Sequence, residues 1–301
     1  MLKRSRLAFA MSISAAVLCG CGGAAETART TTDASPVAAA KDKKHQFESA
    51  KADCMKQKGF KYVAYVKPEK QLSDQDRKLA SGDYEAMRTY REKYGFGIFS
   101  RHVYPTEIGI ETSHEEVDDD PNVKILRKFS PAQHDAYNKA KDACISAASK
   151  QVLGLTVKSN IDYFGQYTLS LRRLRGAELD GDAKLVELAG SMATCLKGKG
   201  HPVKDTKPSR MQRRGEDLFM DQQGAIGREQ QGDLPKGPKM TKETRQFQMP
   251  TLSPQQARPY LDKEIKAALD DLECGKDFYA TYEPRDTAIK QRLNEQFASS
   301  F

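Results

Sequence analysis

The feature that most constrains the fold of this chain is a set of helix signals that occurs twice in the same order. Residues 54–59 read Cys-Met-Lys-Gln-Lys-Gly and residues 195–200 read Cys-Leu-Lys-Gly-Lys-Gly, and each hexapeptide ends an amphipathic stretch. Ser130-Pro131 and Ser253-Pro254 each begin a later stretch, with Gln three residues after Ser. Serine at the N-cap, proline at the first helical position and glutamine at the third favour a capped helix start. The pattern predicts two equivalent pairs of helices.

A second cysteine completes each copy, Cys144 in the first and Cys274 in the second. We therefore interpret residues 43–158 and 159–301 as two halves that arose by a divergent duplication. The alternative is coincidence, because a Ser-Pro start and a glycine after a lysine-rich end are generic helix signals.

Apolar residues recur at helical spacing through much of residues 43–301, and we expect a mainly α fold with a few short strands. Aromatic and β-branched residues at 60–66 predict one strand, and a second extended piece is expected near 98–110. The two halves are each expected to be closed by a disulfide.

The beginning of the chain has the layout of an export signal. Lys3, Arg4 and Arg6 precede residues 7–18, an apolar run without charge. A basic segment before a short apolar run is typical of a signal peptide rather than of a membrane span. The run ends in Leu18-Cys19-Gly20-Cys21, which resembles the lipobox of bacterial lipoproteins.

That resemblance implies that Cys21 is lipidated on sulfur and becomes the first residue of the mature protein, while Cys19 leaves with the signal, residues 1–20. Two or three acyl chains would hold the protein firmly on the outer face of the membrane. Residues 21–42 are small and hydroxylated, and we interpret them as a flexible tether. The alternative is an ordinary signal peptide with a cysteine there by chance. After the signal, no apolar stretch approaches the about 18 residues of a membrane-spanning helix.

Four cysteines follow Cys21, and an even number in an oxidising compartment indicates two disulfides. A metal site would need closely spaced ligands, and the nearest two of these cysteines are 51 residues apart. Four cysteines allow three pairings. Only the repeat selects one of them, Cys54 with Cys144 and Cys195 with Cys274.

No catalytic constellation is recognisable, and we expect no cofactor and no metal. The chain lacks a Gly-x-Ser-x-Gly elbow, a phosphate loop and a His-Glu-x-x-His motif. Glu48-Ser49 resembles the Glu-Ser pair of lytic transglycosylases, but no Gly-Leu-Met-Gln run follows it. The acidic residues 114–123 lack calcium-loop spacing and are interpreted as a solvated loop.

One stretch alternates aromatic residues with glycine, a pattern that lets the backbone approach another group closely. It either packs in the protein's own core or offers an interaction surface to a partner, and the core is favoured because a chain without tryptophan needs its other aromatic residues inside. Its residues are Tyr94, Gly95, Phe96, Gly97, Ile98 and Phe99.

Together with residues 54–62, this stretch looks like part of a group of actinobacterial secreted proteins and lipoproteins. They share a Cys-Met-x-x-x-Gly-Phe start, an aromatic-Gly-aromatic-Gly-Ile stretch and a paired late cysteine. The resemblance covers residues 50–150 and, more faintly, 190–275, and it implies no activity. In the second half His201-Pro202 stands where the first half has Phe-x-Tyr.

The charge pattern does not favour a nucleic-acid partner. The net charge of +8 falls to +5 without the signal, and the basic residues are spread rather than clustered. We expect a lipoprotein anchored to the cell membrane that binds or scaffolds an envelope protein and has no enzymatic activity. The alternatives are a cell-wall hydrolase and, more weakly, a solute-binding component of a transporter, a class that needs alternating strands and helices.

Overall fold

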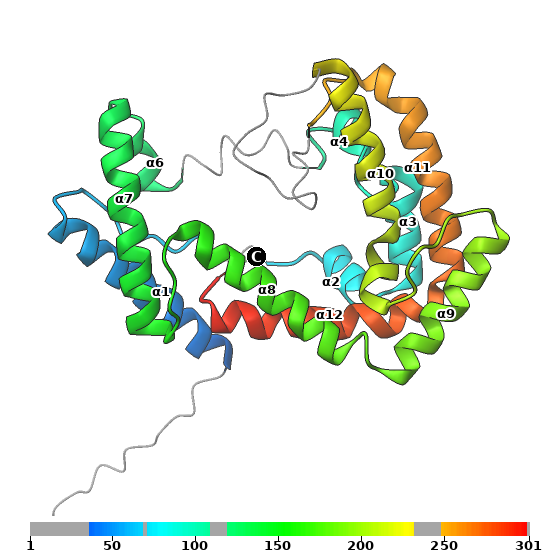
Figure 1. Cartoon of the computed structure of the whole chain (residues 1–301), viewed down its shortest axis with the longest axis horizontal. Coiled ribbons are helices and arrows are strands. Elements are labelled where there is room, and N and C mark those ends of the chain that lie inside the picture. Colours follow the sequence, from blue (N-terminus) through cyan, green and yellow to red (C-terminus); the bar gives the residue numbers. More distant parts are fainter. Residues whose placement is uncertain (1–35, 69–70, 109–118, 232–247, 300–301) are drawn as a thin grey trace, which may run out of the picture. The chain divides into compact units, whose positions relative to one another are not determined.

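The structure, a computed structural model, describes residues 36–68, 71–108, 119–231 and 248–299. Every regular element in these ranges is helical, which confirms the mainly α prediction (Figure 1). The elements are α1 (Pro36–Gln57), α2 (Asp74–Ala80), α3 (Tyr84–Tyr94), α4 (Ser100–Val103), α6 (Pro121–Leu126), α7 (Pro131–Ala148), a π-helical turn η1 (Ser149–Leu153), α8 (Asn160–Glu178), α9 (Ala183–Gly198), α10 (Pro208–Gln231), α11 (Pro254–Cys274) and α12 (Lys276–Gln296).

Both Ser-Pro signals begin helices, as the sequence predicts. At the start of α7 the Ser130 backbone N–H donates to Gln133 Oε1 (2.8 Å), and the Gln133 N–H donates back to Ser130 Oγ (3.4 Å). Ser253 and Gln256 repeat this reciprocal arrangement at the start of α11, at 2.8 and 3.3 Å. Two otherwise unsatisfied backbone donors are bonded at each helix start.

The predicted disulfide pairing is present in the structure. Cys54 near the end of α1 is bonded to Cys144 in α7, with Cα atoms 5.5 Å apart. Cys195 in α9 is bonded to Cys274 at the end of α11, with Cα atoms 5.6 Å apart. Each bridge therefore joins the end of a cysteine-bearing helix to the Ser-Pro helix that follows it.

The strand expected at residues 60–66 does not form, and this segment has no regular secondary structure. Its rings pack inward instead: Phe60 lies edge-on to Tyr137 of α7, with ring centroids 5.5 Å apart. Asn122 binds the backbone of Val63, accepting from its N–H and donating to its carbonyl, both at 2.9 Å. A side chain thus satisfies the groups that a neighbouring strand would have bonded.

The prediction of an extended segment at 98–110 is also wrong for residues 98–108, because they contain the short helix α4. The backbone N–H groups of Ile98 and Phe99 bind the side chain of Glu264 in α11 rather than another strand. Residues 109–110 lie outside the described ranges.

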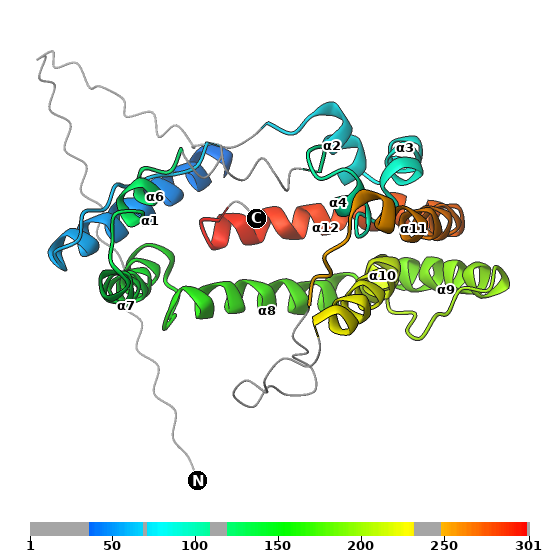
Figure 2. The ribbon, with the colours of Figure 1, turned by 90° about the horizontal axis from the view of Figure 1, so that it is seen from above.

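Two groups of helices follow from this packing (Figures 1 and 2). In one, α1 lies against α7 with a small core of its own. In the other, α11 packs with α9, α3 and α4, and α12 packs along α8 and α9. Helices α3 and α4 therefore lie between the two cysteines of the first half in sequence but pack on a helix of the second half.

The main core lies among α8, α9, α11 and α12. Its largest fully buried side chains are aromatic or long and apolar, as expected for a chain without tryptophan. They include Leu185, Met192, Leu196, Phe278, Tyr279 and Tyr282.

Candidate functional site

Among the residues that the structure describes, three carboxylates are completely buried. Glu264 and Asp271 lie on α11 and Asp286 lies on α12, each with no exposed surface. A buried charge is very unfavourable unless it is paired and hydrogen-bonded. The partners of these three groups therefore show how the helices are held together.

Glu264 is bound by the backbone of the aromatic-glycine stretch. Its Oε1 accepts from the N–H groups of Phe96 (2.8 Å) and Ile98 (2.9 Å), and its Oε2 accepts from the N–H of Phe99 (2.8 Å). Burial raises the pKa of Glu264, and the backbone donors act against that rise. The carboxylate satisfies three donors that have no partner in a regular element, so it determines the path of this stretch.

Glycine at position 95 is required for this close approach. Gly95 has a φ of +61°, and a Cβ added there would lie 2.8 Å from Cγ of Glu264. A side chain would thus meet both backbone strain and a steric clash. The sequence pattern correctly indicates a close backbone approach, and the group approached is a side chain of the same protein.

The aromatic residues of the stretch confirm the core interpretation rather than the interaction surface. Ile98 is 5% exposed and Phe99 is fully buried, stacked on Tyr260 of α11 with ring centroids 5.0 Å apart. Tyr94 is half-buried and donates its hydroxyl to Glu107 at 2.8 Å. Ile98 and Phe99 therefore belong to the core and offer no contact area to a partner, whereas Tyr94 and Phe96 are half-buried.

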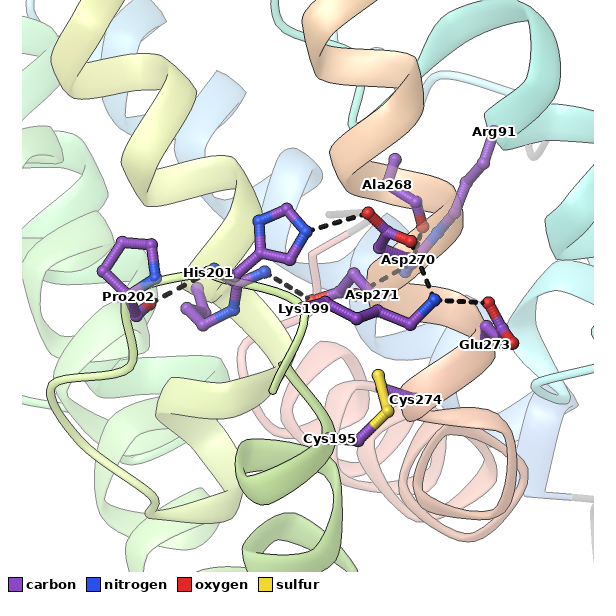
Figure 3. Close-up of polar contacts among 11 residues, drawn as sticks. Arg91, Cys195, Lys199, His201, Pro202, Ala268, Asp270, Asp271, Glu273 and Cys274 are labelled. Carbon is purple, nitrogen blue, oxygen red and sulfur yellow. Dashed lines mark hydrogen bonds and ion pairs between the residues drawn. A yellow bond between two sulfur atoms is a disulfide. The ribbon is translucent and has the colours of Figure 1, made fainter. Parts of the chain in front are cut away.

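Asp271 joins α3, α10 and α12 to α11, and Figure 3 shows it together with Arg91 of α3. Its Oδ1 accepts from Arg91 Nη1 of α3 at 2.8 Å and from the Tyr279 hydroxyl of α12 at 2.5 Å. Its Oδ2 accepts from Arg214 Nη2 of α10 at 3.0 Å. The Arg91 guanidinium also lies over the Tyr279 ring, 4.6 Å from its centroid. The network orients α3, α10 and α12 around α11.

A second, more exposed set of contacts surrounds the Cys195–Cys274 bridge (Figure 3). Lys199, just after α9, donates to Asp270 (2.9 Å) and to Glu273 (2.7 Å) of α11. His201 Nε2 lies 2.9 Å from the other oxygen of Asp270. Hydrogen bonds from His201 and Lys199 lower the pKa of Asp270. His201, which distinguishes the second half in sequence, thus belongs to the contacts that reinforce this bridge.

Asp286 completes the set and joins α8 to α12. Arg175 binds it through two parallel bonds, Nε to Oδ1 at 2.6 Å and Nη2 to Oδ2 at 2.7 Å. Lys290 adds an ion pair at 2.9 Å. Burial alone would raise the pKa of Asp286, but Arg175 and Lys290 lower it overall. All three buried carboxylates therefore have partners within the protein.

A small cavity beside this interior contains two further carboxylates that are only partly covered. Glu216 of α10 and Glu283 of α12 line it together with Tyr90, Arg91 and Gln212, and its volume is about 170 Å³. Burial raises the pKa of both glutamates. Carboxyl groups with raised pKa values can exchange protons with a ligand, but ligand pockets usually measure about 300–1,000 Å³. The cavity is too small for a sugar polymer.

The raised pKa of Glu283 predicts a pH-dependent stability difference. A carboxyl group that binds its proton more tightly in the folded state lowers stability as pH rises above its ordinary pKa of about 4.3. We therefore expect Glu283→Gln, which preserves an acceptor for Gln212, to raise the melting temperature at neutral pH. The gain should shrink below about pH 4.3, where the wild-type group is also neutral. Thermal unfolding across pH measures it.

The exposed Glu229 of α10 provides the control for this experiment. Glu229→Gln should leave the melting temperature unchanged at every pH. A Glu283→Gln protein that is less stable than the wild type at neutral pH would contradict the prediction.

The remaining sequence candidates lie elsewhere. Glu48 accepts from Lys51 at 2.5 Å and from the Tyr62 hydroxyl at 3.2 Å, so it is ion-paired rather than isolated in a cleft. Cys21 and the lipobox, like residues 114–118 of the acidic stretch, lie outside the described residues. Within the described ranges, no group of three or more His, Cys, Asp or Glu side chains is arranged to hold a metal ion.

Sequence reasoning missed the buried charges, although a signal for them was present. Glu264 and Asp271 are seven residues apart, close to two helical turns, and they lie on the same face of α11 as Leu261, Ala268 and Leu272. Acidic residues within an apolar stripe indicate buried partners. Arg91 and Arg214 carry no comparable signal.

Comparisons with family models, with curated proteins and with solved structures find no match to this chain. No helix in the part of the chain that the structure describes has both the length and the apolar character needed to cross a membrane.

Proposed function

We propose that this chain is a lipid-anchored protein of the cell envelope that acts by binding and has no enzymatic activity of its own. The main support for this proposal is that the fully buried carboxylates all have partners within the protein. These carboxylates are Glu264, Asp271 and Asp286. Groups used in this way hold helices together, and their bonded oxygens are not free to act as catalytic acids or bases. The fold, the two disulfides and the paired interior charges are those of a disulfide-stabilised helical binding protein.

Two observations support the extracytoplasmic location. The lipobox-like Leu18-Cys19-Gly20-Cys21 follows a signal-like apolar run. The Cys54–Cys144 and Cys195–Cys274 bridges are of the kind that persists in oxidising compartments outside the cytoplasm. Acylation of Cys21 would then hold the helical part, which begins at Pro36 and not at residue 43 as the sequence predicts, at the membrane.

A cell-wall hydrolase is the second candidate, and the cavity of Glu216 and Glu283 is the observation that favours it. Glycoside hydrolysis commonly uses two carboxyl groups, one with a raised pKa. The small volume of the cavity disfavours it, as does the ion pair of Glu48 with Lys51.

Anchoring is tested by Cys21→Ala, with Cys19→Ala as the matched control. The Cys21→Ala protein should lose its acyl chains and no longer be labelled by a radioactive fatty acid. Cys19→Ala should be labelled and fractionate with membranes like the wild type, because Cys19 leaves with the signal. Labelling of Cys21→Ala would refute the anchor.

Catalysis is tested separately by incubating the full chain with peptidoglycan. We expect no release of soluble fragments. Release that disappears in Glu216→Gln or Glu283→Gln would establish the hydrolase instead, and release lost in Glu48→Gln would restore the transglycosylase interpretation.

A further inference from the structure

An open groove lies between α8 and the first half of α10, away from the buried carboxylates. Its volume is about 520 Å³, within the usual range of ligand pockets. Helix α8 lines one side of it with Leu171 and Arg172, and Lys207 and Arg210 line the other side, while Asp180 comes from the segment after α8.

Basic side chains predominate in this groove. Five Lys or Arg residues line it against two aspartates. Two of the five are already paired, since Arg175 binds Asp286 through two bonds and Arg213 lies 3.3 Å from Asp217. Asp180 accepts from the backbone N–H (2.7 Å) and the hydroxyl (2.8 Å) of Ser209.

The other three cations have no such partner. Within the described part of the chain, the side chains of Arg172, Lys207 and Arg210 make no hydrogen bond or ion pair, and all three are exposed. The start of α10 is not itself a free anion site, because Asp180 binds the Ser209 N–H. The groove therefore has three cations without an ion-pair partner, contributed by α8, by the segment before α10 and by α10 itself, against one carboxylate, Asp180, that is bonded to Ser209 rather than to a cation.

Three cations that line one groove suit a compact anion of more than one negative charge. Arginine presents a planar set of donors that binds phosphate oxygens in pairs, and lysine adds a point charge. Leu171 gives the same wall an apolar portion. A carboxylate ligand has a single negative charge and would balance the three cations less well than a phosphate group.

We propose that the groove between α8 and α10 binds a phosphate-bearing ligand through Arg172, Lys207 and Arg210. This inference rests on the proposed function, because it assumes a binding protein and adds the chemical class of its ligand. It does not depend on the lipid anchor.

Two sources could supply such a phosphate: a soluble molecule and the headgroup of an anionic lipid. Helix α8 also carries three exposed apolar residues, Ile161 at 83%, Leu169 at 61% and Phe164 at 40% exposure. Apolar and basic residues on one helix are compatible with contact at a membrane surface. The experiment therefore separates the two sources.

The test compares two double variants of the full chain with identical changes in charge. Arg172→Glu/Arg210→Glu alters the groove, whereas Arg173→Glu/Arg228→Glu alters exposed arginines of the same two helices that do not line it. All proteins also carry Cys21→Ala, so that acyl chains cannot produce membrane binding. Circular dichroism establishes that both variants are folded like the parent. If the groove variant is not folded, Arg172→Gln/Arg210→Gln replaces it, with Arg173→Gln/Arg228→Gln as its control.

The probes are inorganic phosphate, measured by calorimetry, and phosphatidylcholine vesicles with and without phosphatidylglycerol, measured by flotation. We expect the groove variant to bind about a hundredfold more weakly than the control variant, since each charge-assisted bond typically contributes about tenfold in affinity. High salt should weaken binding by the parent protein.

Loss of inorganic phosphate binding in the groove variant alone assigns the groove to soluble phosphate-bearing ligands. Binding only to vesicles that contain phosphatidylglycerol, lost in the groove variant alone, assigns it to lipid headgroups. Equal losses in both double variants, or no binding of either probe by the parent protein, would overturn the proposal. Neither of those results would bear on acylation of Cys21 or on the peptidoglycan assay.

Discussion

Replacing Asp271 by alanine should lower the free energy of unfolding by about 3–5 kcal/mol, the usual cost of removing one partner from a buried ion pair. The substitution leaves the guanidinium groups of Arg91 and Arg214 without their carboxylate, and both side chains are only 9% exposed. It also removes the acceptor of the Tyr279 hydroxyl. Urea unfolding followed by circular dichroism gives the change directly.

The neighbouring residue provides a matched control for this prediction. Asp270 also binds a lysine and a histidine, but its side chain is 22% exposed and that of Lys199 is 32% exposed. Such pairs typically contribute less than about 1 kcal/mol. Asp270→Ala should therefore cost much less than Asp271→Ala. Similar losses for the two variants would show that the buried network is not what holds α3 and α10 to α11.

Removing the second disulfide with Cys195→Ala/Cys274→Ala should cost about 2–5 kcal/mol. The bridge closes a loop between residues 79 apart in sequence, so its loss frees a long segment of the unfolded chain. Urea unfolding measures the effect. Cys54→Ala/Cys144→Ala should cost a similar amount, because its separation of 90 residues is nearly the same and loop entropy changes slowly with length.

The same prediction requires the pairing itself to be correct. Digestion of the oxidised wild-type protein without reductant should yield linked peptides that contain Cys54 with Cys144 and Cys195 with Cys274. A peptide that joins Cys54 to Cys195 would contradict both the pairing and the repeat. A reducing agent should destabilise the wild type and leave a variant that lacks all four cysteines unchanged.

Local signals in the sequence were sufficient for much of the helical structure. Ser130 and Ser253 begin helices because each serine, with the glutamine three residues later, bonds backbone donors within its own first turn. Such interactions involve neighbours in the chain and depend little on the rest of the fold. The repeated order of these signals also predicted which cysteines pair.

Elements that depend on distant partners were predicted poorly. Residues 60–66 and 98–108 have strand-like composition, but strands need neighbours, and here Asn122 and Glu264 occupy backbone groups that a sheet would use. The aromatic-glycine stretch correctly indicated a close approach. Its partner, Glu264, lies more than 160 residues away in sequence.

The sequence by itself therefore determined the helical class, the helix starts and the disulfide pairing, because each depends on short-range interactions or on an internal repeat. It also carries the signal-like beginning on which the proposed anchor rests. Only the tertiary structure decided that Arg91, Arg214 and Asp271 share a buried network and that Arg172 and Arg210 face one groove. These charges are far apart in the chain, and burial and pairing arise only when α3, α8, α10 and α11 are packed together.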